Sequence, residues 1–108
     1  GDPRRIPPGT LAGYAAPLAI RGAFEYPLTI VRGWREDMQN LAAALPRIAG
    51  IPTLLIWGSR DRVIPVASAT RLQQQFRDCK LIVLQGAGHL PYEELPEEFN
   101  RAVLEFLT

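Results

Sequence analysis

Two short, continuous runs of apolar residues stand out in the second half of the chain. The first lies in residues 53–57 after Pro52, where Thr53 precedes four apolar residues, and the second lies in residues 80–84, where Lys80 precedes four apolar residues. Neither run alternates apolar with polar positions, which is typical of parallel strands that are covered on both faces. The pattern therefore predicts two buried parallel strands, the first of which ends at Gly58.

Apolar residues at helical spacing precede, separate and follow these strands. They predict a helix from Trp34 that stops near Leu45, because Pro46 lacks an amide hydrogen and clashes with the preceding turn. Pro65 opens a second helix and Pro96 a third, at positions where the fixed φ of proline favours a helix start. The inner faces are Met38, Leu41, Ala42 and Leu45, then Ala69, Leu72 and Phe76, then Phe99, Val103, Phe106 and Leu107. The fold class predicted is α/β, a short parallel sheet with flanking helices.

The first 33 residues contain five prolines and five glycines. That density argues against a long regular element and predicts irregular structure with short helical turns. The segment still carries enough apolar side chains to be more than a solvated linker. We therefore divide the chain into a Pro/Gly-rich segment, residues 1–34, and a domain formed by residues 35–108.

Composition removes several classes of function. The chain has 12 Lys and Arg against 11 Asp and Glu and no block of like charges, so it lacks the footprint of a nucleic-acid binder. No apolar run approaches the roughly 18 residues of a membrane helix, and we expect no membrane partner. One cysteine and one histidine give no usual metal site, and no dinucleotide fingerprint is present, so no metal or cofactor is expected. The lone cysteine fits a reducing, cytoplasmic location.

Candidate chemistry lies in the loops that follow the two strands. Residues 58–65 contain Asp61, and residues 86–91 contain His89, the one histidine of the chain. Loops at the carboxyl ends of adjacent parallel strands meet at one edge of the sheet. An aspartate there accepts the Nδ1–H of the imidazole and stabilises the imidazolium, while Nε2 acts as general base and then acid. The sequence thus predicts a catalytic pair, Asp61 and His89.

These two loops carry a resemblance to a known family. Residues 51–61, Ile-Pro-Thr-Leu-Leu-Ile-Trp-Gly-Ser-Arg-Asp, resemble the penultimate strand of α/β-hydrolases and the Gly-x-x-Asp turn with its triad acid. Residues 86–99 are similar to the loop with the triad histidine and the final helix after it. The order Asp before His agrees with the family's Ser, Asp, His order. The resemblance covers residues 35–108 and implies the C-terminal third of the fold, with Asp61 as acid and His89 as base, and with residues 1–34 as the end of the lid.

The chain lacks the family's nucleophile elbow, Gly-x-Ser-x-Gly. Only Gly9 and Gly13 have its spacing, with Leu11 between them. Of the two serines, Ser59 lies in the acid's own loop and Ser68 on the outer part of a predicted helix. Because the elbow, the oxyanion segment and most of the sheet lie upstream in the family, their absence suggests a fragment. The resemblance implies an intact hydrolase with a Ser-His-Asp mechanism on a small ester-like substrate, although some members use an aspartate nucleophile.

Other interpretations of the same residues stay open. Asp61 also suits a turn or a helix cap, and Asp78 is the alternative acid. The acid pairs at residues 93–94 and 97–98 are explained by the dipole of the helix they begin. The chain is also compatible with a non-catalytic interaction or scaffold module, which predicts that His89→Ala leaves its function intact, or with one half of a split hydrolase.

The two predicted strands leave a marginal sheet. Two strands alone are barely stable in water, and open strand edges invite pairing with another chain. We therefore expect self-association or a missing N-terminal companion segment. Without a nucleophile, the 108 residues are expected to be inactive alone.

Overall fold

The computed structural model describes residues 3–108, so residues 1 and 2 of the Pro/Gly-rich segment lie outside the described part. Contacts within the chain divide it into two compact units. Residues 7–45 form the helical unit, and residues 1–6 together with residues 46–108 form the sheet unit. The sheet unit contains both candidate loops, and its geometry determines where Asp61 and His89 lie.

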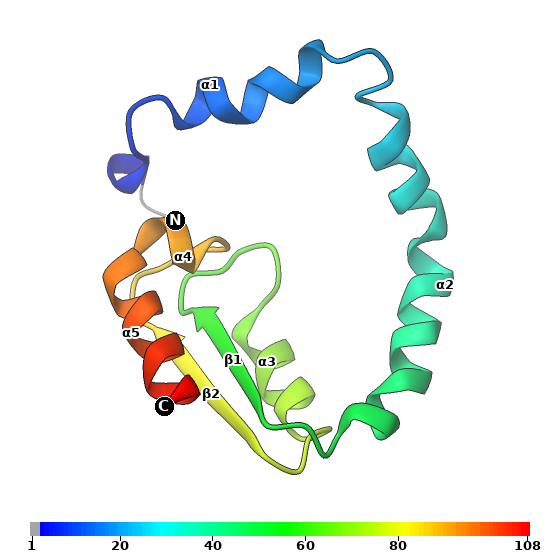
Figure 1. Cartoon of the computed structure of the whole chain (residues 1–108), viewed down its shortest axis with the longest axis vertical. Helices are drawn as coiled ribbons and strands as arrows, with labels where there is room; N and C mark the ends of the chain where they lie inside the picture. The colour runs from blue at the N-terminus through cyan, green and yellow to red at the C-terminus, as the bar shows by residue number, and fades with distance from the viewer. Residues whose placement is uncertain (1–2) are drawn as a thin grey trace. The chain divides into compact units, whose positions relative to one another are not determined.

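The N-terminal part of the chain is helical throughout most of its length. A 3-10 turn, η1 (Pro3–Arg5), belongs to the sheet unit. The helical unit contains α1 (Thr10–Ala15), η2 (Ala16–Ala19) and all but the last turn of α2 (Glu25–Ile48). Figure 1 shows α1 in blue and α2 in cyan to green. The short helical turns expected in the first 33 residues are confirmed for residues 10–19. Among residues 3–108, none of the helices combines the length and apolar character that crossing a membrane requires.

Helix α2 departs from the sequence prediction at both ends. It begins at Glu25 instead of Trp34, because Pro27 falls in the first turn, where backbone amides have no partner within the helix and proline is tolerated. It ends at Ile48, past Pro46. Pro46 removes one hydrogen bond of the last turn, but its fixed φ is itself helical. The predicted start and stop are therefore wrong, and the boundary between residues 34 and 35 falls inside α2.

The sheet unit contains the two predicted strands. Strands β1 (Thr53–Gly58) and β2 (Cys79–Leu84) pair in parallel, in register from the first residue of each to the last. Helix α3 (Val66–Gln73) connects them, and α4 (Pro91–Glu94) and α5 (Pro96–Leu107) follow β2. In Figure 1, α3 and α5 lie on opposite sides of the strand pair. The fold class predicted from the sequence, α/β with a short parallel sheet and flanking helices, is confirmed.

The strands are covered less completely than their sequence predicts. Residues 53–57 of β1 are half-buried and only Gly58 is buried, and Leu84 is the one buried residue of β2. The buried apolar residues of the described chain are small except for Leu84: the others are Ala49, Ala69, Ala87 and Ala102. Leu107, predicted on the inner face of the last helix, is 72% exposed. One helix per face covers only part of the two strands. The burial that their sequence predicts is thus not reached within these 108 residues, in agreement with the expectation that the two strands need more protein to cover them.

Candidate active site

The loop after β1 holds Asp61 in a tight turn. One carboxylate oxygen, Oδ1, accepts hydrogen bonds from the backbone N–H groups of Val63 and Ile64, at 2.8 and 2.9 Å. The indole Nε1–H of Trp57 donates to the carbonyl of Ile64 at 2.9 Å. Aspartate side chains commonly stabilise turns in this way. Asp61 therefore stabilises a turn through Oδ1. Its second carboxylate oxygen, Oδ2, does not take part in these two bonds and contacts a different group.

The loop after β2 carries His89 away from the sheet. It turns at Gly86, whose φ of 80° lies in the left-handed region that favours glycine. Ala87 is fully buried, and the N–H of Gly88 donates to Oε1 of Glu94 at 3.0 Å. The backbone just before His89 is thus fixed by burial and by a hydrogen bond. The His89 side chain itself is 44% exposed.

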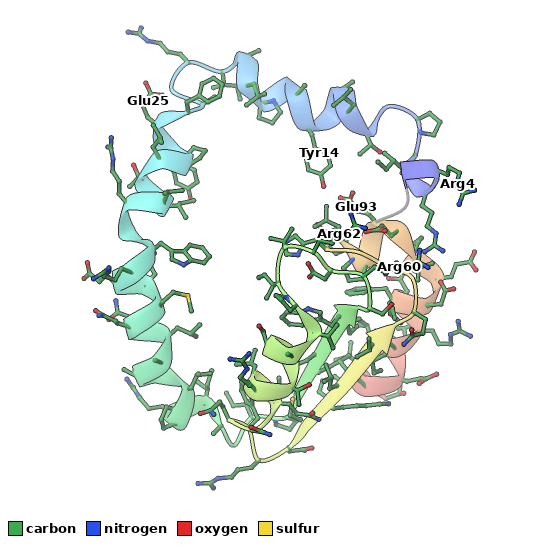
Figure 2. The ribbon with its side chains drawn as sticks, turned by 180° about the vertical axis from the view of Figure 1, so that it is seen from behind. Arg4, Tyr14, Glu25, Arg60, Arg62 and Glu93 are labelled. Carbon is green, nitrogen blue, oxygen red and sulfur yellow. The ribbon has the colours of Figure 1, made fainter. Side chains whose placement is uncertain are left out.

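The two loops are held together along their length. The N–H of Ser59 donates to the carbonyl of Leu84 at 3.0 Å, and the N–H of Arg60 donates to that of Ala87 at 2.8 Å. The first of these bonds belongs to the last pair of the parallel ladder, and the second joins the two loops beyond it. Figure 2 labels Arg60 and Arg62, which flank Asp61, at this end of the sheet.

The close approach of the loops depends on Gly58. A Cβ atom at this position would lie 2.0 Å from the carbonyl oxygen of Gly88 and 2.5 Å from that of Ala87. Real Cβ atoms do not approach backbone atoms this closely, so only glycine permits the contact. The close approach of the base loop therefore explains why the first residue of the Gly-x-x-Asp turn, Gly58, is a glycine in this chain.

The structure brings the predicted pair together. Nδ1 of His89 lies 2.9 Å from Oδ2 of Asp61. The carboxylate is almost completely covered, with 4% of its side chain exposed, whereas the imidazole is open to solvent. Asp78, the alternative acid, directly precedes β2 and therefore lies at the opposite end of the sheet from His89.

The surroundings of Asp61 keep its carboxylate ionised. Burial acts to raise its pKa, but the hydrogen bond to His89 and those from Ile64 and Val63 outweigh burial, and the pKa of Asp61 lies below its ordinary value. An ionised carboxylate can only accept hydrogen bonds. Nδ1 must therefore carry the shared hydrogen, which leaves Nε2 of the neutral ring as a proton acceptor.

Several side chains of the site were not assigned a site role from the sequence. Glu94 was explained by the helix dipole, and neither Trp57 nor Ser59 was given a role in the site. In the structure, the carboxylate of Glu94 accepts a hydrogen bond from the N–H of Gly88. The indole N–H of Trp57 donates to the carbonyl of Ile64, and the hydroxyl oxygen of Ser59 accepts from the N–H of Gly86. No spacing rule predicts these contacts, because each joins residues through a turn whose exact path the sequence does not reveal.

Cys79 does not have the properties of a nucleophile. Burial, and to a smaller extent the charge of Asp78, raises the pKa of its thiol, so the thiol is protonated at neutral pH. It begins β2, at the end of the strand away from His89. Within residues 3–108, no three His, Cys, Asp or Glu side chains gather in a way that suits a metal ion.

The lowered pKa of Asp61 predicts a specific acid dependence of stability. A carboxyl group with a lower pKa in the folded state contributes stability above its unfolded pKa of about 4, and this is lost as the pH falls through the folded value. We expect the urea midpoint of the wild-type chain to fall more steeply between pH 5 and pH 2 than that of Asp61→Asn. Circular dichroism at several pH values measures both. Equal slopes for the two proteins would contradict the assigned hydrogen bonds.

Comparison with known proteins agrees with this architecture. A model of the alpha/beta hydrolase family matches residues 2–102. This match covers most of the chain, and the chain belongs to the alpha/beta hydrolase family.

Individual members of the family show the same similarity. The chain is 38% identical over 87 residues to a 2-hydroxy-6-oxononadienedioate/2-hydroxy-6-oxononatrienedioate hydrolase of Paraburkholderia xenovorans, a match that covers 68% of this chain and 30% of the relative. An alpha/beta hydrolase from the sediment metagenome of the Mar Chica lagoon aligns over 90% of this chain and 43% of its own, with a TM-score of 0.70 and 28% identity. A thermophilic esterase from Thermogutta terrifontis aligns over 60% of this chain and 24% of its own, with a TM-score of 0.57 and 31% identity.

The chain corresponds to a limited part of these proteins. It spans about a quarter of the length of the curated relatives it matches, between 20% and 30% for those of Mycobacterium, Pseudomonas and Paraburkholderia. Family membership and fold are thus shown for the matched segment.

Proposed function

We propose that Asp61 and His89 are the acid and the base of an acyl-hydrolase site whose nucleophile is supplied from outside these 108 residues. The observation that carries the proposal is the 2.9 Å contact between Nδ1 of the half-exposed imidazole and Oδ2 of the covered carboxylate. An ionised acid with a covered side chain behind an accessible imidazole is the arrangement that general-base catalysis by histidine requires.

In this proposal the histidine moves protons in two directions. Nε2 takes the proton of an incoming hydroxyl as its oxygen attacks the acyl carbon, and Asp61 stabilises the imidazolium that forms. The same Nε2–H then protonates the leaving alcohol as the C–O bond breaks, which leaves an acyl-enzyme. Water, deprotonated by His89, attacks the acyl carbon, and the proton returns to the nucleophile's oxygen when it leaves.

The proposed substrate is a small ester or a related acyl compound. An esterase that is similar to this chain supports the ester as substrate, and a similar hydrolase of 2-hydroxy-6-oxononadienedioate, a keto dicarboxylate, supports a hydrolytic reaction without pointing to an ester. The nucleophile is proposed to be a serine in an elbow of the Gly-x-Ser-x-Gly type, since that sequence is absent from the chain and normally precedes the acid and the base in the polypeptide.

The experiment that tests this function uses a chimera. These 108 residues replace the matching segment of the Paraburkholderia hydrolase, which thereby supplies the upstream part of the fold. The folded chimera is treated with a fluorophosphonate, and mass spectrometry locates the label. We expect labelling of one serine outside the 108 residues, and its loss in His89→Ala. A folded chimera that is not labelled, or one that is labelled equally well in the His89→Ala variant, would show that the proposed roles are wrong.

We further propose that the open strand edges pair with a companion segment or, in its absence, with a second copy. The sheet of the described chain has two strands, and most of their residues are only half-buried. Unpaired N–H and C=O groups of an edge strand readily accept another strand. Sedimentation velocity of the isolated chain is expected to show a sedimentation coefficient that rises with concentration. A monomer at every concentration that also unfolds sharply would exclude self-association.

A further inference from the structure

The side chain of Ser59 makes the one described side-chain hydrogen bond that joins the backbone of the base loop directly to the acid loop. Its Oγ accepts the N–H of Gly86 at 2.8 Å, between residues 27 positions apart in the sequence. The contact is partly buried, so water does not freely replace the serine oxygen. This bond differs from the two backbone bonds beside it, because it exists only if residue 59 carries an acceptor.

The bond fixes the residue at which the base loop turns. Gly86 has a φ of 80°, and its N–H no longer points into the strand ladder. The carbonyl of the same residue accepts a longer bond, 3.4 Å, from the exposed side chain of Arg5. Since Arg5 is exposed and its contact is long, the short bond to Ser59 is the stronger of the two restraints on the turn.

A displacement of the Gly86 backbone would be transmitted to the imidazole of His89 through only two residues. Only Ala87 and Gly88 separate it from His89, and both are buried against Gly58 with no room for a Cβ between them. Tightly packed backbone transmits a displacement instead of absorbing it. The distance between Nδ1 of His89 and Oδ2 of Asp61 therefore depends on the turn that Ser59 holds.

We propose that Ser59 is a positioning residue: its hydroxyl holds the turn at Gly86 and thereby keeps the imidazole of His89 in register with Asp61. The proposal rests on the proposed role of His89 as base. It assigns Ser59 no contact with substrate, and it explains the presence of a hydroxyl group in the acid loop of a chain that has only two serines.

The test uses nuclear magnetic resonance of the complete 108-residue chain, in which His89 gives the only imidazole signals. In the wild type we expect ring nitrogen shifts of the Nδ1–H tautomer and a slowly exchanging Nδ1 proton. In Ser59→Ala we expect that proton signal to be lost, the ring shifts to move toward mixed tautomers, and the Gly86 amide to exchange about tenfold faster. Ser59→Thr keeps the hydroxyl and restores the signals, and Ser68→Ala is the matched control.

The outcomes separate positioning from other roles. If Ser59→Ala is folded and keeps the Nδ1 proton, the proposal is overturned, even when the Gly86 amide exchanges faster, because Ser59 would then be only structural. If Ser59→Ala does not fold, Ser59→Cys has the same shape with a weaker acceptor and is judged by the same signals. These signals do not depend on turnover, so an inactive chimera with the expected spectra rejects the proposed function and leaves the positioning role standing.

Discussion

Replacing His89 with alanine in the active chimera will lower kcat/KM for ester hydrolysis by about ten thousand-fold or more. Among the described residues, the imidazole is the group whose Nδ1 contacts the covered Asp61 carboxylate, and 44% of its side chain is exposed. Without it, the attacking hydroxyl must lose its proton to water, and the leaving alcohol receives none. Binding of the ester does not use the ring, so the loss is expected in kcat.

Matched variants show whether the loss is specific. Asp61→Asn keeps the size of the side chain and an oxygen acceptor for Val63 and Ile64, but it no longer stabilises an imidazolium, so kcat is expected to fall by about ten thousand-fold as well. Gln85→Ala changes an exposed neighbour in the same loop and should keep the activity. If His89→Ala retained most of the activity in a folded chimera, the interaction or scaffold interpretation would become the better one.

Substituting Gly58 with alanine will destabilise the sheet unit by more than about 3 kcal/mol, or displace the base loop. The new Cβ would lie 2.0 Å from the carbonyl oxygen of Gly88. That neighbour is backbone in a buried loop, so no flexible side chain can move aside. The loop must shift as a whole, which separates His89 from Asp61.

Gly50→Ala is the matched control for this substitution. Nothing lies within 4 Å of the position that its Cβ would take, and it belongs to the same unit as Gly58. Urea unfolding of the two variants and the wild type measures the difference in free energy. An unchanged midpoint for Gly58→Ala, together with an unchanged spectrum of His89, would contradict the loop contact on which the candidate site depends.

The sequence predicted the sheet and the catalytic pair because their signals are strong and local. The lack of alternation at residues 53–57 was enough to predict a strand. The prediction that Asp61 and His89 meet required only that the two strands be parallel, because the loops after parallel strands lie at one edge of the sheet. The structure places the Nδ1 and Oδ2 atoms of this pair 2.9 Å apart. Whether the pair is catalytic stays a prediction that the experiments above address.

The failures have separate physical origins. The density of prolines before Trp34 and the presence of Pro46 were taken to exclude a helix there. Pro27, however, lies in the first turn of α2, where amide hydrogens have no partner within the helix, and Pro46 lies in the last turn, where it removes a single hydrogen bond. The strands are less buried than their apolar runs predict, because a sequence run shows how apolar a strand is, but not how much protein covers it. The contacts of Ser59 and Glu94 depend on backbone turns that no periodicity encodes.

The candidate site depends on contacts between the two loops. Gly58 lets the base loop approach, Ser59 and Glu94 hold its backbone, and Asp61 receives the imidazole of His89. Each of these contacts belongs to the sheet unit. The pair is therefore built within this chain, and what the proposed mechanism still needs is a nucleophile from elsewhere.

The most direct test of this claim compares the isolated chain and the chimera in one assay of ester hydrolysis. A short alkyl ester followed by pH-stat is the suitable substrate, because an exposed imidazole can itself attack an activated ester. The account predicts that the isolated chain, with or without His89, hydrolyses the ester no faster than buffer, and that the chimera turns it over through His89. Hydrolysis by the isolated chain that disappears in His89→Ala, or a folded chimera without turnover, would contradict it.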